Sequence, residues 1–214
     1  MAPYAIFDIT LTLEKGMLTY PKDVPYQRTL QRSISQGATS NVSVVEMSAH
    51  TGTHIDAPRH YLNDGAAVDT LPLEVLYGQA FVIDCAGVPA VTAKLLAERI
   101  PPAAQRILLK TDNSRNLQPP FRRDFVYLDG SGARLLADRG VKLVAIDYLS
   151  IDKAGTASKP SHFTLLESQI VIIEGVNLAQ VPPGEYFLAC GPLKMADADG
   201  APCRAVLISG LKIE

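Results

Sequence analysis

The feature that most constrains the fold of this chain is a run of four potential metal ligands between His50 and His60. Three of the protein's four histidines lie in these eleven residues, and a carboxylate, Asp56, stands two places after the second of them, His54. Imidazole suits zinc and similar metals, and a carboxylate can bind one ion or bridge two. An isolated histidine is usually a surface or core residue satisfied by hydrogen bonds. Such a concentration instead predicts a metal site through His50, His54 and Asp56.

The local sequence favours a loop that leaves a strand over a long helix. His50 and His54 would share one helical face, but the Thr-Gly-Thr and Ala-Pro segments of this stretch disfavour a helix. Residues 41–49 alternate valine and methionine with polar residues, which is typical of a strand. We expect that strand to end at His50, and a turn at Gly52 to bring His54 and Asp56 back towards it.

Composition indicates one folded unit and excludes several classes of partner. The chain has 214 residues, of which 47% are hydrophobic and 20% charged. We therefore expect a single domain over residues 1–214 with a sizeable core. A net charge of −2 gives no reason to expect nucleic acid or an anionic membrane as a partner. No apolar run reaches the ~18 residues of a membrane span.

The three cysteines, Cys85, Cys190 and Cys203, are an odd number at wide spacing. This pattern suits buried thiols in a reducing compartment better than a disulfide framework. A catalytic thiol is the alternative, but none of the three lies near a histidine in the sequence. The N-terminal residues lack the basic region and apolar stretch of a signal peptide. These features predict a cytoplasmic protein.

Hydrophobic patterning predicts many strands and two or three helices, and hence a mixed α/β or α+β domain. A helix is expected over 91–100, with Thr92 as its N-cap and Pro101 after its end, and another after residue 132 that ends at Arg139. Residues 68–77 form a short apolar piece broken by Pro72. Strands are expected over residues 5–13, 27–35, 41–49, 79–85, 106–111, 125–128, 141–147, 169–174, 185–190 and 203–208.

Two further candidate ligands lie far along the chain. His162 is the fourth histidine, and Glu174 follows it by twelve residues, directly after an apolar run. A carboxylate in that position is costly to bury unless it is paired or bound to metal. Taken alone, Glu174 is more simply a surface residue at a strand end. Within the motif, Arg59 could hold an acidic substrate or be a solvated loop residue.

The stretch from His50 to His60 resembles the signature H-x-G-T-H-x-D-x-P-x-H of the cyclase family of metal-dependent hydrolases. That family includes the bacterial arylformamidases (kynurenine formamidases) and isatin hydrolase. Every fixed position of the signature is met. The similarity continues through residues 64–74, 140–147 and 182–184. The resemblance implies the swivelling β/β/α architecture.

The resemblance also implies a ligand set. The formamidases carry a histidine followed about twelve residues later by a glutamate, as His162 and Glu174 are here. If the ligand roles of that family apply to this chain, His50, His54 and Asp56 would bind one ion and His162 would bind a second. Asp56 and Glu174 would bridge the pair. One or two divalent ions per chain are therefore expected, with zinc and manganese as the leading candidates.

Two roles beyond the ligands follow from the same resemblance. His60 would be the catalytic acid/base, since an imidazole can move a proton at physiological pH. The arylformamidases place a tryptophan before Pro-Gly-Asp in their first loop, where it contacts the aromatic substrate. This chain has Tyr20-Pro21-Lys22-Asp23 and no tryptophan. Tyr20 is thus the expected substrate-binding residue, and the loop departs from the arylformamidase pattern.

The activity implied is hydrolysis of an amide-type C–N bond, in an aryl formamide or a cyclic amide, by metal-activated water. The substrate would be a small molecule, and the enzyme a homodimer or homotetramer. One alternative is an ester or lactone hydrolase of the same family. Another is a non-catalytic metal- or ligand-binding protein, whose metal shell would be saturated. A serine hydrolase is not favoured, because no G-x-S-x-G occurs.

Overall fold

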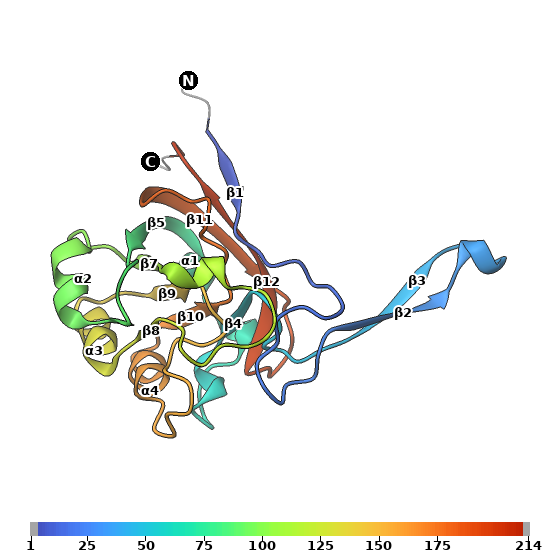
Figure 1. The fold of residues 1–214 in the computed structure, drawn as a ribbon, viewed down its shortest axis with the longest axis horizontal. Coiled ribbons are helices and arrows are strands. Elements are labelled where there is room, and N and C mark those ends of the chain that lie inside the picture. The colour runs from blue at the N-terminus through green and yellow to red at the C-terminus, as the bar shows by residue number, and fades with distance from the viewer. Residues whose placement is uncertain (1–3, 212–214) are drawn as a thin grey trace.

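A mixed, closed sheet forms the centre of the computed structural model, which describes residues 4–211 (Figure 1). The eight strands are ordered β1-β12-β11-β5-β7-β9-β10-β4, and β4 also pairs with β12. Seven strands therefore close on themselves, and β1 adds to β12 outside the ring. The strands are β1 Ile6–Asp8, β4 His54–Asp56, β5 Tyr77–Asp84, β7 Arg106–Lys110, β9 Leu143–Ile146, β10 Val171–Glu174, β11 Gly184–Pro192 and β12 Gly200–Ile208.

Four neighbouring strands of this sheet, β5, β7, β9 and β10, run parallel. Strands β9 and β10 are buried along their whole length, and such strands read as continuous apolar runs because both faces are covered. In β9, Leu143 and Ala145 face a core inside the closed sheet. Val144 and Ile146 face a second core between the sheet and the helices. The alternation follows from the two-residue period of a strand.

The helices α2 (Ala93–Arg99), α3 (Gly130–Asp138) and α4 (Pro160–Glu167) cover that second core (Figure 1). The predicted N-cap of α2 is confirmed, because the Thr92 side chain accepts a hydrogen bond from the Leu95 N–H. Helix α4 was not predicted from the sequence. The apolar piece at 68–77 forms a 3₁₀ turn, Val68–Thr70, and a short helix, α1 (Leu73–Leu76).

A two-stranded arm projects from the body of the molecule (Figure 1). It consists of β2 (Gln27–Arg32) and β3 (Val42–Glu46), which pair antiparallel and are joined through a 3₁₀ turn at Ile34–Gln36. The expected strands at 27–35 and 41–49 are therefore present but lie outside the closed sheet. Their apolar side chains are largely exposed, among them Leu30, Ile34 and Val44.

The remaining elements are small. Strands β6 (Ala90–Val91) and β8 (Tyr127–Leu128) form a parallel pair, and 3₁₀ turns occur at Pro58–His60 and Asp112–Arg115. The predicted mixed α/β class is confirmed, although four α-helices occur within residues 4–211 where two or three were expected. In that same part of the chain, no helix is long and apolar enough to cross a membrane.

Candidate metal centre

His54 and Asp56 lie on β4, the strand that closes the sheet. Residues i and i+2 of a strand share a face, so the two side chains point the same way while Ile55 points into the inner core. Only 2% of His54 and none of Asp56 is exposed. The expectation of a loop at these residues was wrong. Pairing with strands on both sides satisfies the backbone and imposes the extended conformation.

Strand pairing brings Glu174 to the same place. Glu174 on β10 lies opposite His54 on β4, and it is only 4% exposed. Considered alone, this residue was more simply a surface glutamate, and that interpretation was wrong. His162 comes from the first turn of α4 and is 2% exposed. The peptide N–H groups of Ser161 and His162 donate to Asp152, at 3.0 and 3.1 Å, and so orient this turn.

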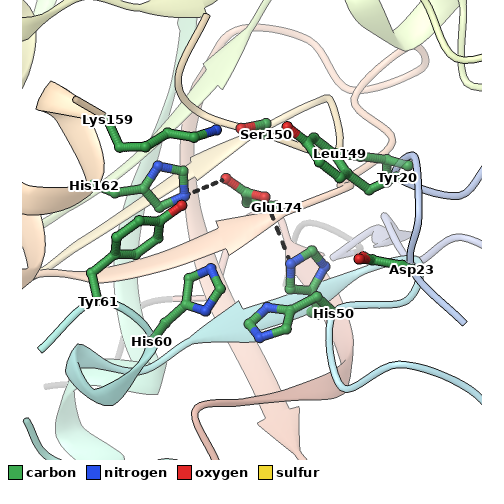
Figure 2. Close-up of a pocket in the computed structure, with 11 residues that line it drawn as sticks. Tyr20, Asp23, His50, His60, Tyr61, Leu149, Ser150, Lys159, His162 and Glu174 are labelled. Atoms are coloured by element: carbon green, nitrogen blue, oxygen red, sulfur yellow. Dashed lines mark ion pairs between the residues drawn. The ribbon is translucent and has the colours of Figure 1, made fainter. Parts of the chain in front are cut away.

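Two buried imidazoles face two buried carboxylates. His54 Nε2 lies 3.4 Å from Asp56 Oδ1 and 3.6 Å from Glu174 Oε2. His162 Nε2 lies 3.5 Å from Asp56 Oδ2 and 3.2 Å from Glu174 Oε1. Figure 2 shows His162 beside Glu174. Each carboxylate thus spans the space between the two rings.

The other nitrogen of each ring is held by a second group. His54 Nδ1 donates to the Gly52 carbonyl oxygen at 2.9 Å, and His162 Nδ1 donates to Asp152 Oδ2 at 2.6 Å. Metal-ligating histidines are almost always oriented in this way, because the outer bond fixes the tautomer that leaves the inner nitrogen free to coordinate. The arrangement fits a pair of Nε2 ligands.

One buried polar atom supports the same interpretation. Asp56 Oδ2 is buried and has no hydrogen-bond partner among the described residues. Buried polar atoms nearly always have a partner, so an unsatisfied carboxylate oxygen requires an explanation. Ligand atoms of His50, His54 and Asp56 lie within 4.8 Å of one another, as do those of Asp56, His60 and His162. A divalent cation would satisfy Asp56 Oδ2, and the surrounding imidazole and carboxylate donors fit such an ion.

His50 and His60 form the outer part of the site with Asp199, a residue that sequence reasoning missed. His50 bonds Asp56 Oδ1 through Nδ1 and Asp199 Oδ2 through Nε2, both at 2.8 Å. His60 Nδ1 lies 3.5 Å from Asp199 Oδ2, and its ring centroid is 4.1 Å from that of His50. Asp199 directly precedes β12. Only the pairing of Gly200 with Asp56 brings it here.

The electrostatics of the site favour positive charge. Burial opposes the charged form of His50, but its hydrogen bonds to Asp56 and Asp199 outweigh burial and raise its pKa to about 9. Burial also opposes the charged form of His162, but its hydrogen bond to Asp152 and the nearby carboxylates of Asp56 and Glu174 outweigh burial and raise its pKa well above the usual value. For His60 burial dominates and lowers the pKa. The carboxylates therefore form a strong cation-attracting centre.

The four histidines and Glu174 line a cavity of about 210 Å³ (Figure 2). Tyr20, expected to bind substrate, lies in its wall and packs edge-on against Phe121, with ring centroids 5.1 Å apart. Arg59 is not among the lining residues. Sequence reasoning also missed several wall residues, because they come from loops whose positions depend on the closed sheet. Those residues are Asp23, Tyr61, Leu149, Ser150 and Lys159.

Solved structures share this fold over nearly the whole chain. One described as a potential metal-dependent hydrolase with cyclase activity has a TM-score of 0.87 and 34% identity, and the match covers 98% of this chain and 100% of that one. Isatin hydrolase A from Labrenzia aggregata has a TM-score of 0.82, 24% identity and coverage of 96% and 93%, which shows the fold alone. Fold and site together define a metal-dependent hydrolase.

Sequence relatives give the family. Residues 7–153 match the family described as "Putative cyclase". A kynurenine formamidase of Salinibacter ruber (strain DSM 13855 / M31) is 36% identical over 205 residues, covering 95% of this chain and 97% of the relative. Cyclase-like protein 3 of Oryza sativa subsp. japonica is 38% identical over 215 residues, covering 95% and 79%. The chain belongs to the cyclase family, and these relatives together with the histidine–carboxylate cluster support a metal-dependent amide hydrolase.

Proposed function

We propose that this enzyme hydrolyses the C–N bond of an aryl formamide or a cyclic amide. The observation that carries the proposal is the pair of buried imidazoles, His54 and His162, directed at two buried carboxylates, Asp56 and Glu174, beside a cavity. Kynurenine formamidases among the relatives and isatin hydrolases among the structural neighbours act on these two kinds of bond.

The metal ligands in this proposal are His50, His54 and Asp56 for one ion and His162 for a second, with Asp56 and Glu174 shared between them. The short contacts of both carboxylates to both Nε2 atoms support sharing. Zinc and manganese are the candidate metals, at one or two ions per chain. A divalent cation held there would polarise the substrate carbonyl. It would also lower the pKa of water, so that hydroxide is available as the nucleophile at neutral pH.

The chain's own residues supply the proton transfers. His60 lies at the cavity wall, and we assign it as the catalytic acid/base, which takes a proton from the attacking water and delivers it to the leaving amine. Tyr20 and Leu149 present apolar surface to the same cavity, which suits a flat aromatic substrate. We assign Tyr20 to substrate binding on this ground.

We further propose that the protein works in the cytoplasm as a homodimer or homotetramer. Cys85, Cys190 and Cys203 are free and buried, which suits a reducing compartment. The exposed apolar residues of the β2–β3 arm suit burial against a second copy.

The test is metal content together with turnover. Protein purified without chelator should contain at least about one divalent ion per chain, and chelation should abolish hydrolysis of formanilide until metal is restored. Asp56→Asn should lose most of the metal, because it removes the carboxylate common to both ions, and His162→Ala should lower the stoichiometry. Asp64→Asn, at an exposed turn outside the site, is the control.

Full activity of metal-free protein would exclude the mechanism. Unchanged metal content in His162→Ala would exclude the second ion. Hydrolysis of phenyl esters or lactones without hydrolysis of formanilide would indicate the ester branch of the family. Bound metal without turnover of either class would indicate a non-catalytic binding protein.

A further inference from the structure

The cavity contains one cationic side chain besides its histidines. Lys159 is the sole lysine or arginine in the described wall, whereas the carboxylates of Asp23 and Glu174 lie in the same wall. Its side chain is about half-buried. In Figure 2 the Lys159 ammonium extends past His162 towards Ser150, on the opposite side of Glu174 from His60. A substrate that extends from His60 past Glu174 would therefore place its far end near Lys159.

The ammonium of Lys159 forms no ion pair with a carboxylate within residues 4–211, although the Asp152 carboxylate attracts it at longer range. The cationic ion pairs in this part of the chain are made by arginines, namely Arg59, Arg115, Arg122 and Arg204. The near neighbour of the Lys159 ammonium is an aromatic face, with Nζ 5.8 Å from the centroid of the Tyr20 ring. Burial disfavours the charged form, but Tyr61, Tyr20 and Asp152 outweigh it and raise the pKa of Lys159, so the side chain is a cation without an ion-pair partner and is available to an incoming anion.

The backbone at Lys159 is also unusual. Its φ and ψ are 42° and 55°, the left-handed region that glycine or asparagine normally occupies. Strained residues of this kind cluster at functional sites. The strain is not explained by capping, because the Lys159 side chain makes no cap hydrogen bond to α4. The first N–H groups of that helix are already bonded to Asp152, so they do not offer an alternative anion site.

We propose that Lys159 determines specificity by pairing with a carboxylate on the substrate, so that the enzyme prefers acidic aryl amides to neutral ones. This inference rests on the proposed hydrolase function. Tyr20 and Lys159 together offer an aromatic face beside a cation, which is complementary to an aromatic ring that bears an acid group. Arg59 does not compete for this role, since it lies outside the wall and its guanidinium is 3.9 Å from Asp197.

The experiment compares formanilide with its 2-, 3- and 4-carboxy derivatives as substrates of the metal-loaded enzyme. The wild type should prefer at least one carboxylated isomer by roughly 10- to 100-fold in kcat/KM, the usual effect of a hydrogen bond to a charged group. Lys159→Met should abolish the preference by raising KM for the preferred carboxylated isomer more than for formanilide. Lys159→Arg should retain the preference, because it keeps the charge.

Two further variants distinguish the effect of losing the Lys159 charge from the effect of losing folding stability. Lys159→Asn removes the charge but tolerates left-handed backbone, so it should lose the preference without loss of stability. Lys153→Met is the matched control, since Lys153 is exposed on the preceding loop outside the cavity wall. A wild-type enzyme without preference, or a preference that survives in both Lys159→Met and Lys159→Asn, overturns the proposal.

Direct binding distinguishes failure of this proposal from failure of the hydrolase function. Calorimetric titration of metal-loaded protein with benzoate should show affinity weakened about tenfold or more in Lys159→Asn but not in Lys153→Met. If no formanilide derivative is hydrolysed, the hydrolase function fails, and this titration alone decides the role of Lys159. Equal affinity in the variants, or no binding to the wild type, overturns the carboxylate site.

Discussion

At the scale of single residues, His60 differs from the histidines on either side of the carboxylates. His54 and His162 have one ring nitrogen bonded at 2.9 and 2.6 Å to a fixed acceptor, which orients the other nitrogen. His60 has only Asp199 at 3.5 Å, and 26% of its side chain is exposed. A less constrained ring at the cavity wall suits proton transfer better than permanent coordination.

We therefore expect His60→Ala to retain most of the bound metal and to lose about 10²–10⁴-fold in turnover, the usual contribution of general acid–base catalysis. The loss should be greatest for substrates with poorly leaving amines, which need protonation most, and least for activated esters. Metal analysis and a series of ring-substituted formanilides measure the two quantities. Lost metal with equal losses across the series would make His60 a structural ligand.

At the scale of elements, β4 determines the site because it is paired on both edges. The three residues of β4 lie between β10 and β12, so His54 faces Glu174 on one side while Asp56 faces Gly200 on the other. The chain segments next to β4 approach one another closely, which leaves little room for an added side chain. Gly175, which follows β10, has φ +69°, and a Cβ there would clash with the Gly52 carbonyl oxygen.

Gly175→Ala should therefore destabilise the protein and weaken metal binding, because the Gly52 carbonyl also holds the His54 ring. Gly16→Ala is the matched control: its φ is +83°, but nothing lies within 4 Å of the added Cβ. The control should cost about 1–2 kcal/mol for left-handed backbone alone, and Gly175→Ala clearly more. Urea unfolding and metal titration measure both effects. Equal costs for the two variants would show that the close approach is unimportant.

At the scale of the whole molecule, the β2–β3 arm stands out because a single chain leaves its apolar side chains exposed. Its strands pack on each other but not on the closed sheet (Figure 1). Leu30, Ile34 and Val44 are 47%, 57% and 51% exposed. An isolated two-stranded hairpin is marginally stable in water, so contact with a second copy would stabilise it.

Light scattering at micromolar concentration should therefore show a dimer or tetramer. Leu30→Lys combined with Val44→Lys should shift the population towards monomer, because it would place charges in an apolar interface. Leu73→Lys is the control, since Leu73 is 65% exposed and lies outside the arm. A monomeric wild type would contradict the assembly, and an unchanged mass in the double variant would exclude the arm as the interface.

Across these scales, the sequence allowed most elements to be predicted but not their arrangement. The buried strands were recognisable as apolar runs, and Thr92 as a cap, because both signals are local. Helix α4 was missed because the eight residues from Pro160 to Glu167 have only weak helical amphipathicity. The strand before His50 was recognised, but its place in an exposed arm depends on contacts that alternation of side chains does not encode.

The sequence by itself was enough to predict a metal centre, because three histidines and an aspartate that could bind a metal stand close together in the chain. Tertiary structure decided how the rest of the site is assembled. It buried Glu174 against His54 through strand pairing, and it brought Asp199 to His50 across 149 residues. It also placed Lys159 in the cavity wall. These neighbours come from distant segments, and only closure of the sheet through β4 brings them together.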